Sequence, residues 1–233
     1  NITWTISTSA ITGDGTVIPS LAAGVIQDPS GNNNAISTST DNSVTYDSTS
    51  PTVTVEQAGT QADPTTSNSI SFTVTFSEAI DAATFAAADI STAGTAAGVT
   101  WNAPTTGDNI TWTITTATVT GDGTVIPSLG AAVVQDLAGN TNAASTSTDN
   151  SVTYDTAGPS VTVNQAGTQS DPTNNSNVAF TVVFSEAIDP ATFVAGDITV
   201  GGTATGVTFG APTTGDKITW TITTAAITGD GTI

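Results

Sequence analysis

The stretch Asn109-Ile-Thr-Trp-Thr-Ile114 occurs three times in this chain and decides how the chain is organised. It is found again as residues 1–6 and, with lysine in the first position, as residues 217–222, at a constant separation of 108 residues. A period of this length exceeds the ~20–50 residues of a solenoid repeat and matches one small domain. The chain is therefore expected to be a string of domains.

The repeat extends well beyond this stretch. Residues 1–47 align with residues 109–155 without a gap, and 36 of the 47 pairs are identical. The remaining residues also align without a gap at the same separation. The predicted domains are the C-terminal part of one repeat (1–47), one complete repeat (48–155) and the N-terminal part of a third (156–233).

The complete repeat is patterned for β-structure. In residues 70–76 isoleucine, phenylalanine and valine alternate strictly with serine and threonine, and this period of two is typical of a half-buried strand. Residues 109–116 alternate in the same way, which predicts that Ile110, Trp112 and Ile114 face inward. About seven short strands, with turn residues every ~8–12 positions and no helical periodicity, predict an all-β fold of tandem Ig-like sandwiches.

The composition excludes several kinds of function. The chain has 20 acidic residues and one basic residue, for a net charge of −19. Binding to nucleic acid or to an anionic membrane surface requires lysine and arginine, so neither is expected. Cysteine and histidine are absent, which removes disulfides, thiolate metal sites and the commonest general base. We therefore expect no enzyme, although Glu78 and Asp81 form a pair of nearby carboxylates.

Several short runs resemble the bacterial Ig-like repeat domains of large tandem-repeat surface adhesins and fibres. They are Pro159-Ser-Val-Thr-Val163, Phe180-Thr-Val-Val-Phe-Ser-Glu186, Asp136-Leu-Ala-Gly-Asn140 and Ser151-Val-Thr-Tyr-Asp155. The resemblance covers the whole chain and implies a spacer or fibre module on a bacterial cell surface or in a secreted protein. It implies no catalytic residues. In related adhesin repeats calcium ions often lie at domain junctions.

The acidic residues fit such a calcium site when the chain is traced through a sandwich. The turns that hold Glu78 and Asp136 are predicted to lie at one pole, which meets the opposite pole of the preceding repeat. Clustered carboxylates are the ligands that Ca²⁺ prefers. The alternative is that these acids only keep the surface soluble. The candidate ligands are Asp14, Asp47, Glu78 and Asp136 at one junction, and Asp122, Asp155 and Glu186 at the next.

Two linker hydroxyls are candidate glycosylation sites. Ser48 and Thr156 each follow an aspartate in a pattern that resembles a bacterial O-glycosylation acceptor. Ordinary linker chemistry is the competing interpretation.

The leading hypothesis is a stalk or filament segment whose partners are neighbouring repeats and other copies of the same polymer. The alternative is an adhesive module whose pole loops recognise a glycan or a host protein. Binding loops should differ between copies, but Gly13-Asp-Gly-Thr16 is identical to Gly121-Asp-Gly-Thr124, which favours the spacer. The two end pieces are expected to be completed by further sequence of a longer polymer or, as a second possibility, by another copy in trans.

Overall fold

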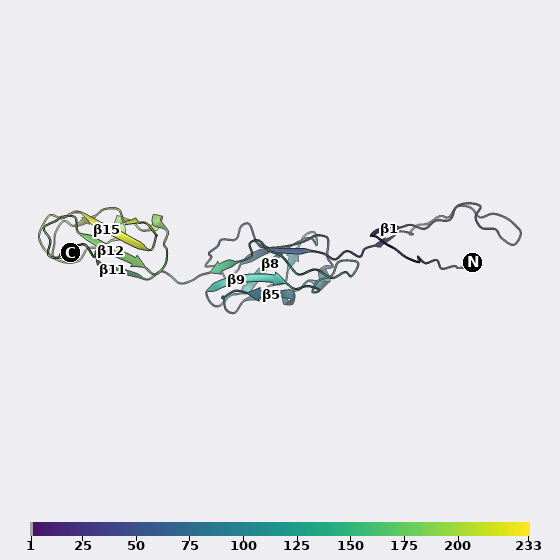
Figure 1. The fold of residues 1–233 in the computed structure, drawn as a ribbon, viewed down its shortest axis with the longest axis horizontal. Helices are drawn as coiled ribbons and strands as arrows, with labels where there is room; N and C mark the ends of the chain where they lie inside the picture. Colours follow the sequence, from purple (N-terminus) through teal and green to yellow (C-terminus); the bar gives the residue numbers. More distant parts are fainter. Residues whose placement is uncertain (1) are drawn as a thin grey trace. The chain divides into compact units, whose positions relative to one another are not determined.

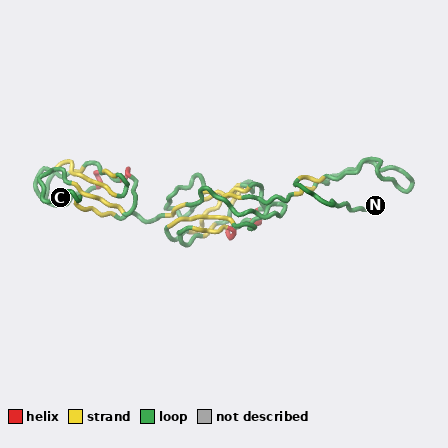
Figure 2. Tube along the Cα trace, viewed as in Figure 1, coloured by secondary structure: helices red, strands yellow, loops and turns green. Residues whose placement is uncertain are grey.

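The computed structural model describes residues 2–233; Asn1, the first residue of the first motif copy, lies outside the described residues. The fold is all-β with antiparallel sheets, as the sequence predicted. The chain divides into two compact units, Asn1–Thr156 and Ala157–Ile233, which are described separately. Figure 1 labels the main strands, and Figure 2 shows how short the strands are relative to the loops.

Residues 48–155 in the first unit contain two sheets. The larger follows the order β3-β4-β8-β6, with β7 also paired to β8. Its register places Val55 beside Val74, and Val74 beside Trp112. The strands are β3 (Val53–Gln57), β4 (Ser71–Phe76), β6 (Thr100–Trp101), β7 (Thr105–Thr106) and β8 (Thr111–Thr118).

The smaller sheet has the order β10-β9-β5. Its strands are β5 (Ile90–Ala93), β9 (Gly123–Leu129) and β10 (Val152–Tyr154). Pro127, which cannot donate a backbone hydrogen bond, is inside β9, the middle strand. However, β10 pairs only with Gly123–Val125, so the missing N–H of Pro127 interrupts no ladder on that side.

The two sheets enclose one core. Two 3₁₀ turns, η1 (Ala82–Thr84) and η2 (Ala87–Asp89), precede β5, and Phe85 between them is buried. The fully buried members of this core include Phe72, Val74, Ile114, Val125, Val134 and Val152.

One predicted core residue was wrong. Ile110 is exposed over about a third of its surface (36%). Asn109 has a left-handed backbone, with φ of 61°, so the chain turns there and β8 begins only at Thr111. The Asp108 carboxylate accepts hydrogen bonds from the Ile110 and Thr111 amides (2.9 and 2.7 Å), and this turn takes Ile110 out of the alternation.

Residues 2–47 contain one pair of strands, β1 (Gly15–Val17) and β2 (Val44–Tyr46). This pair has the register of β9 and β10, since Val17 lies beside Val44 as Val125 lies beside Val152. The apolar side chains of this segment, purple in Figure 1, are largely exposed.

The second unit, green to yellow in Figure 1, contains one sheet of order β11-β12-β15-β13, with β14 also on β15. Val182, Trp220 and Ile222 form a small core on it. Among residues 2–233, no helix is long and apolar enough to cross a membrane. The elements are β11 (Val161–Gln165), β12 (Ala179–Phe184), η3 (Pro190–Thr192), η4 (Ala195–Asp197), β13 (Thr208–Phe209), β14 (Thr213–Thr214) and β15 (Thr219–Ala226).

Candidate metal centre

Three carboxylates from distant parts of the sequence meet at one end of the complete repeat. Asp47 follows β2, Glu78 follows β4, and Asp136 follows β9. One carboxylate oxygen from each lies within 4.8 Å of the other two. Asp136 is buried, while Asp47 and Glu78 are half-buried.

Backbone hydrogen bonds bring these segments together. Ile80 and Asp136 form an antiparallel bridge, and the Asp81 amide donates to the carbonyl of Gln135 (2.8 Å). The turn after β4 therefore lies against the turn after β9. The Asn140 side-chain amide donates to the backbone carbonyl of Asp47 (3.2 Å), which attaches the incoming chain to the same end.

Asp136 is held in place by its own turn. Its Oδ1 accepts from the backbone amides of Ala138 and Asn140 (both 2.8 Å), and its Oδ2 accepts from the Asn140 side chain (2.8 Å). Burial disfavours the charged form of Asp136, but these hydrogen bonds outweigh burial and lower its pKa. The group is therefore anionic at neutral pH, and Oδ2 keeps a lone pair for a further ligand.

The surroundings of Glu78 shift its pKa in the opposite direction from that of Asp136. Burial raises its pKa, and the negative charges of Asp47, Asp136 and Asp14 raise it further. Ionisation of this glutamate is therefore disfavoured. A divalent cation at this point would turn that repulsion into attraction.

Asp14 is the fourth acid of this region. Its carboxylate accepts from the Ser48 amide (2.9 Å), the Ser48 hydroxyl (2.7 Å) and the Thr49 hydroxyl. These bonds, that of Thr49 foremost, lower the pKa of Asp14. Asp14 thus fixes the linker after Asp47 and adds negative potential to the cluster.

The geometry suits a hard cation. An ion at about 2.3–2.6 Å from each oxygen allows oxygen–oxygen separations of up to about 5 Å, which is the spacing observed. Ca²⁺ takes about 6–8 oxygen ligands, so three carboxylates would need bidentate binding, backbone carbonyls or water to complete the shell. Asp47, Glu78 and Asp136 are the residues that could hold the ion.

The second predicted set is divided between the two units and stays a prediction. Asp122 accepts from the Thr156 amide (3.1 Å) and hydroxyl (2.8 Å), as Asp14 does from Ser48. Asp155 corresponds to Asp47, whereas Glu186 belongs to the other unit. The counterpart of Asp136 would be residue 244, beyond the 233 residues of the sequence.

The two candidate glycosylation sites have a structural role. The Ser48 and Thr156 side chains are exposed, and each hydroxyl donates to an aspartate. These bonds account for a hydroxyl at each position. Glycosylation at Ser48 and Thr156 stays a prediction.

The sequence analysis did not identify two asparagines, Asn140 and Asn142, that hold this end of the repeat together. Asn140 contacts both Asp47 and Asp136, and the buried Asn142 makes four hydrogen bonds to the backbone around it. A signal was present, because Asn32 and Asn34 occupy the same places one period earlier. The Asn32 amide and side chain donate to the Asp28 carboxylate as those of Asn140 donate to Asp136.

No protein-family model matches this chain, and no curated protein does so. Among solved structures, the N-terminal part of the bacterial S-layer protein SbsC is similar, with 21% sequence identity and a TM-score of 0.32. The match covers 79% of this chain and 42% of the S-layer chain, so this chain spans less than half the length of its match. A similarity of this size identifies neither fold nor role, and the proposals below depend on the chain's own geometry.

Proposed function

We propose that this chain is a segment of a tandem array of Ig-like domains that serves as a spacer or stalk on a bacterial surface. The observation that supports this proposal most strongly is that the side-chain hydrogen bonds that hold the loops are repeated as well as the strands. The Asn34 side chain makes the four backbone hydrogen bonds that Asn142 makes one period later. Residues that hold a domain together are thus kept from copy to copy, as a mechanical role requires.

Loop similarity supports the spacer over the adhesive module. The turn at Gly121–Thr124 repeats residues 13–16 without change, and the linker bond from Thr156 to Asp122 repeats that from Ser48 to Asp14. In an adhesive module, the loops of the copy that binds the ligand need a particular set of side chains, and the loops of another copy are free to differ. Uniform poles are what stacking of like units requires.

We further propose that Ca²⁺ stiffens the joint before the complete repeat. Asp47 lies in the linker, while Glu78 and Asp136 lie on the repeat. Without a cation these charges repel, and this repulsion adds to burial in raising the pKa of Glu78. With Ca²⁺ bound, the linker carboxylate would be attached to the pole, and bending at the joint would be restricted. Short linkers between domains otherwise permit relative motion.

The calcium hypothesis is tested by small-angle scattering and thermal unfolding on a chain of several full repeats, with calcium and then with chelator. Calcium should increase the maximum dimension and raise the melting temperature. With free Ca²⁺ at 100 times the Kd of the site, binding would stabilise the folded state by about 2.7 kcal/mol. Glu78→Gln should abolish both effects, whereas Asp149→Asn, on the exposed Asp149, should leave them intact. Equal dimensions and melting temperatures with calcium and with chelator would refute the calcium hypothesis. They would not contradict the spacer role.

The proposed location is tested separately, by protease treatment of intact cells that produce the natural protein. A surface spacer should be cleaved without lysis. Protection until the cells are broken would contradict the surface assignment.

A further inference from the structure

The first and last segments of the complete repeat lie side by side and run in the same direction. Thr54, on β3, forms a parallel bridge with Thr146. Further along, Thr65 forms a parallel bridge with Tyr154, at the end of β10. The other neighbour of β3 is β4, which runs antiparallel to it. The chain therefore enters the repeat along one of two parallel segments and leaves it along the other.

Backbone hydrogen bonds join these two segments from end to end. The opening segment is residues 51–65, and the closing segment is residues 143–155. Their bonds, each from an amide to a carbonyl, are Ala143 to Pro51 (2.9 Å), Thr146 to Val53 (3.0 Å), Val55 to Thr146 (3.0 Å), Gln57 to Asp149 (2.6 Å), Thr65 to Thr153 (2.9 Å) and Asp155 to Thr65 (3.0 Å). Both segments advance together through this series. Pro51, where the chain enters, and Asp155, where it leaves, thus lie at opposite ends of the pair.

This arrangement decides how the pair responds to tension. A pull on the two ends of the repeat draws the opening and closing segments past each other along their own direction. The hydrogen bonds run across from one segment to the other, so the load falls on all of them together. A pull that separates the two segments from one end would instead break the bonds one after another.

The side chain of Glu56 adds to the backbone bonds in the middle of the pair. Its Oε1 accepts from the Thr148 amide (2.9 Å), and its Oε2 accepts from the Asp149 amide (2.7 Å). The hydroxyls of Ser147 and Thr148 also donate to Oε2 (both 3.3 Å). Hydrogen bonds to a carboxylate are stronger than those between neutral groups. Glu56 therefore fixes the register of the closing segment on β3.

These bonds keep Glu56 charged. Burial raises its pKa, but the hydrogen bonds from Asp149, Thr148 and Ser147 outweigh burial and lower it below its ordinary value. The donors come from three consecutive residues of the closing segment. At neutral pH the carboxylate thus holds one short stretch of that segment with charge-assisted bonds.

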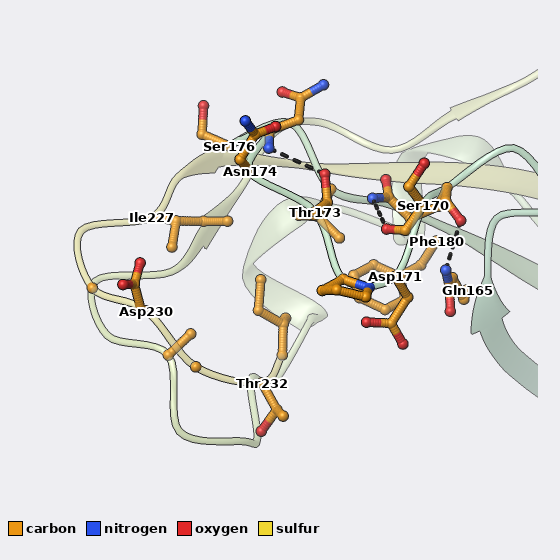
Figure 3. A pocket seen from close by; sticks show the side chains of 18 of the residues that line it. Gln165, Ser170, Asp171, Thr173, Asn174, Ser176, Phe180, Ile227, Asp230 and Thr232 are labelled. Carbon is orange, nitrogen blue, oxygen red and sulfur yellow. Dashed lines mark hydrogen bonds between the residues drawn. The ribbon is translucent and has the colours of Figure 1, made fainter.

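The far end of the pair has a second carboxylate. Asp63 accepts a hydrogen bond from the Thr153 amide (2.9 Å), next to the backbone bonds of Thr65. The sequence keeps both loop residues one period later, as Asp171 and Thr173. Figure 3 shows these two side chains on one loop of the second unit. The polar groups that fasten this end are therefore repeated from copy to copy.

We propose that the opening and closing segments form a tension clamp, with Glu56 as its central anchor. Its function rests on the proposed spacer role, because a repeat is pulled lengthwise only when neighbours pull on both of its ends. Resistance to a pull is set by the barrier to unfolding. The clamp raises that barrier for one direction of load, beyond what the equilibrium stability of the fold provides.

The anchor differs between copies. Asn164 occupies the place of Glu56 one period later. The asparagine side chain carries no charge and has a single oxygen that can accept, so it replaces only part of what Glu56 does. Repeats with asparagine at this position should yield to tension before repeats with glutamate.

The main test compares two directions of pulling on the same fold. The chain has no cysteine, so introduced cysteines alone decide where the force acts. Ser50→Cys with Gly158→Cys loads the clamp lengthwise, and Ser50→Cys with Ala144→Cys opens it from one end. All three positions are exposed.

At one fixed force, the lengthwise pull should unfold the repeat at least ~10-fold more slowly than the pull from one end. The reason is that several hydrogen bonds must then break together. Equal rates for the two directions would overturn the proposal. Every side chain of the clamp is intact in this comparison, so its outcome does not depend on a destabilised variant.

Glu56→Asn tests the anchor under the lengthwise pull. It should speed unfolding at a fixed force at least ~10-fold, because a bond to a carboxylate is lost. Asp108→Asn is the matched control, since Asp108 also accepts from two consecutive amides, those of Ile110 and Thr111, but lies outside the clamp. It should leave the rate nearly unchanged. An unchanged rate for Glu56→Asn, or equal acceleration by Asp108→Asn, would overturn the role of Glu56.

The outcomes also separate the clamp from the spacer role. If the direction of pulling makes no difference, the clamp is refuted, while a spacer that unfolds one repeat at a time would stand. If the natural protein is protected from protease in intact cells, the surface assignment fails, while the dependence on direction would remain a property of the fold.

Discussion

Replacing Asn142 by alanine should be among the most damaging single changes to the complete repeat. The Asn142 side chain is 2% exposed. It accepts from the Val133 and Val134 amides (2.9 and 2.8 Å) and donates to the carbonyls of Gly130 and Ala143 (2.8 and 2.7 Å). A buried donor left without a partner costs about 1–3 kcal/mol. With Val134 fully buried, we expect the free energy of unfolding to fall by about 3 kcal/mol, and the melting temperature by roughly 13 °C.

The repeat supplies a matched control. Asn34 makes the same four hydrogen bonds in residues 2–47, but it is only half-buried. Water can replace its bonds, so Asn34→Ala should cost about 1 kcal/mol or less. Urea unfolding followed by tryptophan fluorescence measures the first loss, and hydrogen exchange at the Val25 and Ile26 amides measures the second. Equal losses from the two changes would refute the reasoning that burial, and not the bonds alone, sets the cost.

Three further predictions concern the same repeat. Gly94→Ala should lower the free energy of unfolding by about 2 kcal/mol or more, because φ is +103° and a Cβ would lie 2.1 Å from a backbone oxygen; Gly107→Ala, with open space around it, should change it by less than about 0.5 kcal/mol in the same urea titration. In chelator, Glu78→Gln should raise the melting temperature at pH 7, because burial and, after it, neighbouring charges raise the pKa of Glu78; the gain should vanish below about pH 4, where this acid is protonated in both states. The stability that Asp136 contributes should be fully present above about pH 4 and be lost as the pH falls through its lowered folded pKa, so Asp136→Asn should flatten the acid limb of a plot of urea midpoint against pH, and an unchanged limb would contradict this assignment.

The strands could be predicted from the sequence where one face is buried and the other is exposed to solvent. Residues 70–76 alternate because each inward residue enters the core, and β4 confirms that pattern. The pattern misled at Ile110, because the left-handed backbone at Asn109 comes from a local turn that alternation does not record. The two-residue strand β7 could not be predicted, since its pairing is set by β8 and not by its own composition.

The candidate metal centre was predicted from the topology of the sandwich more than from a sequence motif. Tracing the chain through a sandwich predicted that Asp47, Glu78 and Asp136 would approach one another, and the structure brings their oxygens within 4.8 Å. Asn140 escaped notice, although Asn32 occupies its place one period earlier, because its hydrogen bond to the Asp47 carbonyl joins segments far apart in the sequence.

Single-molecule stretching of a chain of several full repeats tests most directly whether the 108-residue period is the mechanical unit of a spacer. Each repeat should unfold in one step and release roughly 360 Å of chain, the extended length of 108 residues less the small folded length. Steps of one size, equal in number to the repeats, are the predicted result. A smooth extension without steps, or steps unrelated to the period, would contradict the account.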